Sequence, residues 1–96
     1  MDEKLLQYLK QYKEKNKEKY HIKRLGIFGS YVKETNHDNS DIDIVVDFSK
    51  PDLLSQVAIM NDLKQHFKKD VDVIAYWEKM NPRLKNRIEK DAIYVW

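Results

Sequence analysis

The segment Asp41–Phe48 constrains the fold more than any other part of this 96-residue chain, because its residues alternate in character. Successive side chains of a β-strand point to opposite faces. One face of the predicted strand is therefore apolar and carries Ile42, Ile44, Val46 and Phe48. The other face carries three acids and one valine: Asp41, Asp43, Val45 and Asp47. We expect helices to cover the apolar face and a polar cleft to lie over the acidic face.

The other segments predict helices and strands around this strand. Apolar residues at helical spacing predict helices over residues 3–19, 52–67 and 82–90, with Asp52 as an N-cap and Pro82 in a first turn. Strands are predicted over 21–28 and 70–76, and a short strand or tail over 92–96. Between the first two strands we expect a helical turn over 31–34 and a polar loop over 35–40.

This order of elements predicts an α/β or α+β domain, in which a small mixed β-sheet is flanked by helices. The loop between strands 21–28 and 41–48 is short, so we expect these two strands to run antiparallel. The helix over 52–67 is long enough for a crossover, which makes strand 70–76 parallel to strand 41–48. The length fits one domain over residues 1–96.

The composition indicates in which compartment the protein works and which partners it is expected to lack. The chain has no cysteine, which excludes disulfides and thiolate metal sites and is compatible with a reducing interior. Neither a membrane span nor the apolar core of a signal peptide is present, so we expect a cytoplasmic protein with no membrane partner. A formal net charge of +2 is too small to favour a nucleic acid as partner.

The acidic face of strand 41–48 predicts a metal site. Two carboxylates about 4 Å apart repel each other by roughly 4 kcal/mol at an effective dielectric constant near 20. The parallel strand 70–76 adds a third carboxylate, Asp72, beside Asp41 and Asp43. Carboxylates gathered in this way suit one or two Mg²⁺ ions, which also bind phosphate oxygens and water.

The dipeptide Gly29-Ser30 stands where the preceding strand ends, close to the expected acids. Glycine lets the backbone approach a phosphate closely, and Ser30 offers hydrogen-bond donors. A Gly-Ser pair alone predicts only a turn, but its combination with the acidic strand predicts a nucleotide site.

For several other acidic and histidine residues we weigh roles other than binding of the Mg²⁺ ion. A calcium loop made of Asp38, Ser40, Asp41 and Asp43 would lack the glycine and the distant glutamate of an EF-hand. For Asp70 we favour a capping or salt-bridge role over that of a fourth ligand, and we expect Asp47 to be solvated. His37 lies in the loop before Asp41, where contact with a substrate is an open alternative.

Two segments of the chain resemble the signature of the DNA polymerase β nucleotidyltransferase superfamily. They are Gly-Ser-Tyr-Val-Lys at 29–33 and Ser-Asp-Ile-Asp-Ile-Val-Val at 40–46. The small size points to its minimal nucleotidyltransferase (MNT) branch. Residues 71–74 resemble the strand that carries the family's third carboxylate, and residues 82–88 and 92–95 resemble its usual ending. The resemblance implies a polymerase β-like nucleotidyltransferase fold.

The resemblance also implies roles for single residues. Asp41 and Asp43 would hold Mg²⁺ together with ATP, and Asp72 would be a ligand or would activate the incoming hydroxyl. Gly29 and Ser30 would cradle the phosphates, and Lys33 would add a positive charge there. The family commonly has arginine and then glycine where this chain has Lys33 and Glu34. Lysine keeps the charge but lacks the planar fork of arginine.

Many MNT proteins are encoded beside a HEPN-domain ribonuclease toxin and act as its antitoxin by transferring AMP from ATP to a toxin tyrosine. The resemblance implies the same activity here, with ATP and a HEPN toxin as partners. Two alternatives stay open at this point. The chain is a binding module that neutralises its partner by contact alone, or it is a small-molecule nucleotidyltransferase that needs a second subunit to hold the acceptor.

Overall fold

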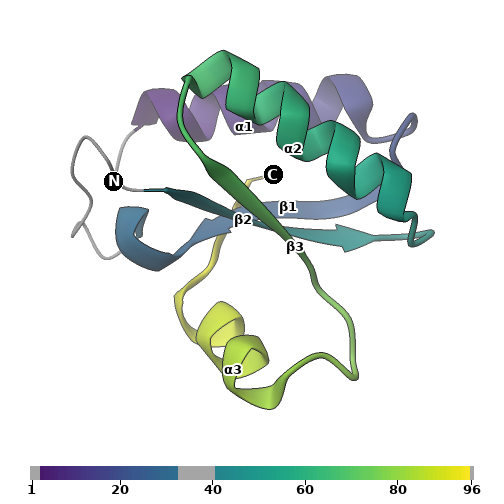
Figure 1. Ribbon diagram of the computed structural model, residues 1–96, viewed down its shortest axis with the longest axis vertical. Helices are drawn as coiled ribbons and strands as arrows, with labels where there is room; N and C mark the ends of the chain where they lie inside the picture. Colours follow the sequence, from purple (N-terminus) through teal and green to yellow (C-terminus); the bar gives the residue numbers. More distant parts are fainter. Residues whose placement is uncertain (1–2, 33–40, 96) are drawn as a thin grey trace.

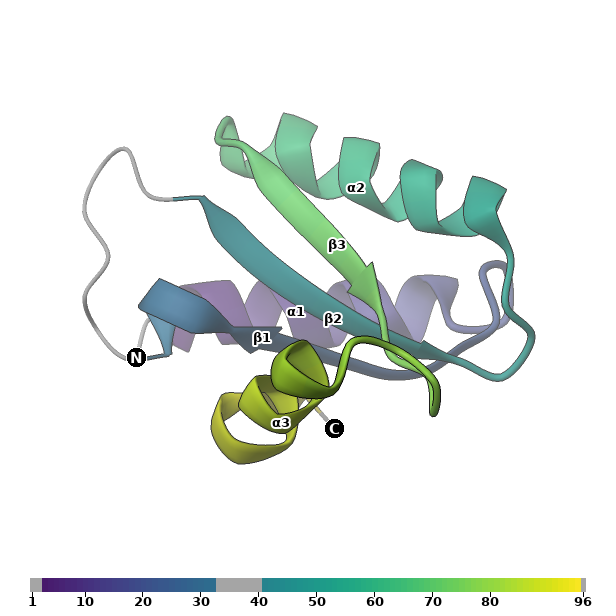
Figure 2. The same cartoon turned by 60° about the horizontal axis from the view of Figure 1, so that its bottom comes forward.

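The computed structural model describes residues 3–32 and 41–95, and in this part of the chain four strands form one mixed sheet with helices on both faces (Figure 1). In chain order the elements are α1 (Glu3–Asn16), β1 (Ile22–Phe28), the 3₁₀ turn η1 (Gly29–Tyr31), β2 (Ile42–Phe48), α2 (Leu53–Phe67), β3 (Val71–Ala75), α3 (Pro82–Asp91) and β4 (Ile93–Val95). Helices α1 and α2 lie over one face of the sheet and α3 lies over the other (Figures 1 and 2). The expected mixed sheet flanked by helices is confirmed.

The strand order is β3-β2-β1-β4. Strands β1 and β2 are antiparallel, with Phe28 opposite Asp43, and β2 and β3 are parallel, with Asp43 opposite Asp72. Both predicted directions are therefore confirmed. The terminal segment is a strand, because β4 pairs antiparallel with β1.

The first helix is shorter than the predicted range 3–19, which was wrong at its end. Beyond Asn16 the chain turns, with the Tyr20 amide donating to the Asn16 carbonyl at 2.9 Å. His21 has a φ of 57°, in the left-handed region, and therefore stands outside the strand rather than starting it. The segment after Tyr12 offers few apolar side chains to hold a longer helix against the sheet. The turn after β1 also begins earlier than predicted, at Gly29 instead of Tyr31.

Two helices begin at side-chain caps. Asp52 accepts a hydrogen bond from the Leu54 amide at 3.0 Å and another from the Ser55 hydroxyl at 3.0 Å. Asn81 accepts from the Arg83 amide at 2.9 Å, and Pro82 occupies the start of α3. Both starts agree with the capping signals of the sequence.

The sheet separates two apolar clusters of different size. Among the described residues, sixteen are buried in the large core under α1 and α2: Leu5, Leu9, Tyr12, Ile22, Leu25, Ile27, Tyr31, Ile42, Ile44, Val46, Phe48, Ile59, Leu63, Val71, Val73 and Val95. In the same part of the chain, four are buried in the small cluster under α3: Phe28, Val45, Met80 and Ile88. The predicted faces of β2 are confirmed, because its even-numbered residues lie in the large core and Val45 in the small cluster.

Side chains from the helices reach both edge strands of this sheet. On β3, the Val73 carbonyl accepts a hydrogen bond from Gln56 Nε2 of α2 at 2.8 Å. On β4, the Val95 carbonyl accepts one from Lys13 Nζ of α1 at 3.3 Å. Each edge therefore has one carbonyl bonded to a helix of the same chain.

Among the described residues, no helix has both the length and the apolar character that crossing a membrane requires.

Candidate functional site

Three acids on and next to two neighbouring strands lie near each other on the face of the sheet that α3 covers. Asp43 and Asp72 are paired across the parallel strands β2 and β3, and Asp41 lies just before β2. The side chain of Asp43 is half-buried, while Asp41 and Asp72 are exposed. Burial raises the pKa of Asp43, and the negative charges of Asp72 and Asp41 raise that pKa further. The structure thus places close together the acids that the sequence predicted as one site.

The turn η1 lies directly against this site. Gly29 has a φ of +80°, which favours glycine over other residues. A Cβ atom at this position would collide with Oδ2 of Asp43. The backbone angle therefore favours glycine, and a larger residue here would also displace the carboxylate of Asp43. Because Phe28 pairs with Asp43, the sheet register itself brings the turn and the acid together.

Arg87 of α3 is a functional candidate that the sequence reasoning missed. Its positive charge lowers the pKa of Asp43, opposing the two neighbouring acids. In the sequence Arg87 belongs to a run of charged residues on a short helix, and only the packing of α3 across the sheet brings it near the carboxylates. The helical spacing of Leu84 and Ile88 could have indicated which side of α3 meets the sheet, but not which part of the sheet it meets.

The remaining predicted residues fall into two groups. The side chain of Ser30 lies outside the described residues, and so do Lys33, Glu34, His37, Asp38 and Ser40. Asp70 is exposed and lies 3.6 Å from the Lys64 ammonium, which confirms the salt-bridge interpretation. The expectation that Asp47 is solvated was wrong.

Asp47 is instead part of an ordered cluster on the α3 side of the sheet. Its Oδ2 lies 3.0 Å from Nη2 of Arg24, and its side chain is 18% exposed. The same guanidinium lies 4.5 Å from the ring centre of Tyr94 and 5.4 Å from that of Tyr76. Tyr94 and Tyr76 come from β4 and the end of β3, so no local pattern around Asp47 indicated this arrangement.

The donor set suits a hard divalent cation. Carboxylate oxygens are the ligands that Mg²⁺ prefers, and a cation would relieve the repulsion that raises the pKa of Asp43. Within residues 3–32 and 41–95, no three acidic or imidazole side chains lie close enough to enclose a metal ion by themselves. A cation here would need further oxygens, as Mg²⁺ has when it is bound to nucleotide phosphates.

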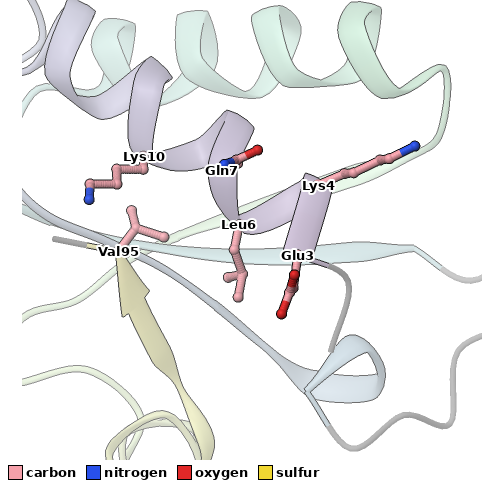
Figure 3. Close-up of a pocket in the computed structure, with 6 residues that line it drawn as sticks. All are labelled: Glu3, Lys4, Leu6, Gln7, Lys10 and Val95. Atoms are coloured by element: carbon pink, nitrogen blue, oxygen red, sulfur yellow. The ribbon is translucent and has the colours of Figure 1, made fainter.

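A pocket elsewhere on the molecule does not share this chemistry. Figure 3 shows it between α1 and the end of β4, on the side of the large core. It is lined by Glu3, Lys4, Leu6, Gln7, Lys10 and Val95. This mixture of charges and apolar groups does not converge on one chemistry, so we place the functional site at the carboxylates.

Comparison with known proteins identifies the family of this chain. The family model described as "Polymerase beta, Nucleotidyltransferase" matches residues 3–96. The chain belongs to this nucleotidyltransferase family. The match spans every described element of the fold, and it confirms the resemblance found in the sequence.

Curated relatives of this nucleotidyltransferase are of nearly the same length. A Methanocaldococcus jannaschii protein, provisionally named a protein adenylyltransferase, is 39% identical over 88 residues, which cover 91% of this chain and 90% of the relative. Protein adenylyltransferase MntA of Thermococcus cleftensis is 32% identical over 89 residues, covering 88% of this chain and 85% of the relative.

Solved structures share the fold of this nucleotidyltransferase. The crystal structure of a toxin-antitoxin with AMP-PNP has a TM-score of 0.73 at 23% identity, covering 91% of this chain and 72% of that one. A tri-AMPylated Shewanella oneidensis HEPN toxin in complex with MNT antitoxin has a TM-score of 0.66 at 19% identity, covering 95% and 71%. These similarities show a shared fold, and together with the family match they confirm the polymerase β-like fold.

Proposed function

We propose that this nucleotidyltransferase transfers AMP from Mg²⁺-bound ATP to a tyrosine hydroxyl of a HEPN-domain toxin and thereby acts as its antitoxin, in the cytoplasm. The observation that carries the proposal is the register of the sheet, which pairs Asp43 with Asp72 and sets the Gly29 turn against Asp43. The names of the adenylyltransferase relatives and of the MNT–HEPN complex support a protein as the acceptor and a HEPN toxin as the partner.

In the proposed reaction the tyrosine oxygen attacks the α-phosphorus of ATP. A bond forms between these two atoms, the bond from the α-phosphorus to the bridging oxygen breaks, and pyrophosphate leaves. Asp41 and Asp43 would hold the metal, which when bound supplies positive charge to the phosphate oxygens.

Other residues of the chain would accept the proton of the hydroxyl and bind the phosphates. The exposed carboxylate of Asp72 is placed to accept the proton of the attacking hydroxyl, or to serve as a third ligand. Gly29 leaves room for the phosphates, because any side chain there would fill the space beside Asp43. The expected contributions of Ser30 and Lys33 to phosphate binding belong to this proposal as well.

The test is transfer of label from ATP, carrying a radioactive α-phosphate, to the purified HEPN protein in the presence of Mg²⁺. The double variant Asp41→Asn/Asp43→Asn should lose transfer by about 100-fold or more, the size of effect seen when a group that stabilises a transition state is removed. Asp70→Asn is the matched control, because this acid lies at the start of β3 but is exposed and paired with Lys64. Transfer that survives in the double variant would refute the assignment of the site.

Neutralisation by contact alone is the second candidate function. It is favoured by large apolar side chains that are exposed near the end of β3 and the start of α2: Leu53 (71%), Leu54 (79%) and Trp77 (54%). Such groups suit a protein partner. If the double variant still protects the toxin target while transferring no AMP, contact explains the antitoxin effect.

A further inference from the structure

Helix α3 is fixed beside the carboxylates by its buried side. Ile88 is 0% exposed and belongs to one apolar cluster with Phe28 and Val45. Phe28 is the pairing partner of Asp43, and Val45 lies two residues beyond Asp43 on the same face of β2. Figure 2 shows α3 on this side of the sheet. The helix is therefore held by residues adjacent to the acidic site.

This placement brings a cation to the site. Arg87 immediately precedes Ile88, is exposed to solvent, and is close enough to Asp43 for its charge to act on that carboxylate. Arg87 does not take part in the ion pairs that the structure shows among the described residues. Arg24, on the same face, differs in this respect, because Asp47 and two tyrosine rings already occupy its guanidinium.

Binding of ATP would add several negative charges to a site that already has three carboxylates. A bound divalent cation cannot balance all of them, so a further cation is needed near the phosphates. A guanidinium is suited to this task, because its planar fork donates two parallel hydrogen bonds to phosphate oxygens. Lys33, which stands where the family commonly has arginine, lacks that fork.

We propose that Arg87 is a triphosphate-binding residue of this enzyme, whose guanidinium contacts the β- and γ-phosphates of ATP from α3. The inference rests on the proposed function and adds a residue to its site. It assigns to α3 a part in nucleotide binding besides its packing on the sheet.

Binding of Mg²⁺-ATP and of AMP to the purified chain, measured by calorimetry, tests this inference. Arg87→Ala and Arg87→Gln should each weaken ATP binding by about tenfold or more, the usual effect of losing charge-assisted hydrogen bonds. AMP binding should not change, because AMP has no β- or γ-phosphate. Arg87→Lys should bind ATP with intermediate affinity. Arg83→Ala is the matched control, since it removes an exposed arginine one turn earlier on α3.

Each result has a distinct meaning when circular dichroism shows that the variants are folded. If ATP binds both Arg87 variants as tightly as the unaltered chain, the inference is overturned, while AMP transfer by the unaltered chain still upholds the proposed function. An equal loss in Arg83→Ala also overturns it, because the effect would then be one of general charge. If the unaltered chain neither binds ATP nor transfers AMP, the proposed function and this inference fail together.

Discussion

The two faces of the sheet are built differently although they share the same four strands. The face under α1 and α2 is an apolar core, closed further by a hydrogen bond of 2.7 Å from the Tyr12 hydroxyl of α1 to Asp62 of α2. The face under α3 has a small apolar cluster, and beside it lie the acids Asp41, Asp43 and Asp72. Most buried apolar residues among those described thus lie on one face, and the candidate site lies on the other.

This division shows how a short chain can tolerate charge repulsion among the acids of its candidate site. Repelling carboxylates destabilise the folded state, and the apolar area buried on the opposite face offsets that cost. The acids also sit on the strands that carry the large core, because each strand presents alternate residues to the two faces. The core therefore fixes the positions of the acids through the strands that the two share.

The largest expected effect on stability comes from replacing one buried isoleucine on each face of the sheet by alanine. Ile59 and Ile88 are both 0% exposed, the first in the large core and the second in the small cluster. Each replacement by alanine should lower the free energy of unfolding by about 2–5 kcal/mol. The loss for Ile59→Ala should lie near the upper end of this range, because the large core surrounds the cavity that it leaves. The loss for Ile88→Ala should lie near the lower end, because α3 can move onto the sheet and fill part of its cavity.

Urea denaturation measures the stability of this pair, and AMP transfer under conditions where both variants are folded measures function. Ile88→Ala should lose more transfer activity than Ile59→Ala, because its helix carries Arg87. Equal activity losses in the two variants would contradict the view that the α3 face carries the candidate site while the opposite face mainly supports stability.

A smaller effect is expected from the two helix caps, one on each face. Replacing Asp52 or Asn81 by alanine should cost about 1 kcal/mol of stability. Loss of the Asp52 cap should appear in the global unfolding transition, because α2 packs on the large core. Loss of the Asn81 cap should instead speed hydrogen exchange locally in α3, because few buried residues hold that helix. Global destabilisation by both variants would show that α3 is as firmly integrated as α2.

The smallest expected effect is a gain in stability from Asp43→Asn in buffer with a metal chelator. Burial and the neighbouring acids raise the pKa of Asp43 in the folded chain, so its charged form is disfavoured there. The variant should be more stable than the unaltered chain at neutral pH. The difference should shrink as the pH falls through the raised pKa, and it should vanish below the ordinary value of 3.8.

Thermal unfolding across this pH range measures the effect, with Asp70→Asn as a control that should show no gain. Adding Mg²⁺ should stabilise the unaltered chain more than Asp43→Asn, as expected for a ligand that binds the folded state. A variant that is less stable at neutral pH would show that Asp43 supports the fold rather than straining it.

Much of the fold could be predicted from the sequence, because apolar and mostly acidic residues alternate along β2 and mark its two faces. The alternation from Asp41 to Phe48 gave the strand, its apolar side and its acidic side, and the short loop and the long crossover helix gave the strand directions. The signals at Asp52 and Pro82 were predicted, and the starts of α2 and α3 match them. The end of α1 was missed, because no glycine or proline near Asn16 marks it.

The parts of the site that could not be predicted depend on contacts between distant segments. Asp72 was foreseeable, since a parallel register places it beside Asp43. The positions of Arg87 and of the Arg24–Asp47 pair depend on how α3 and β4 return to the sheet. Periodicity shows which side of α3 is apolar, but the register of a helix on a sheet is decided by packing.

The bonds from Gln56 and Lys13 to the outer strands have a consequence for how this protein meets other molecules. An unprotected sheet border is a template on which a neighbouring chain can add a strand and begin to aggregate. Here the borders at Val73 and Val95 are each occupied by a side chain from the molecule's own helices. A chain that adds a strand at Val73 or Val95 would first have to displace that side chain.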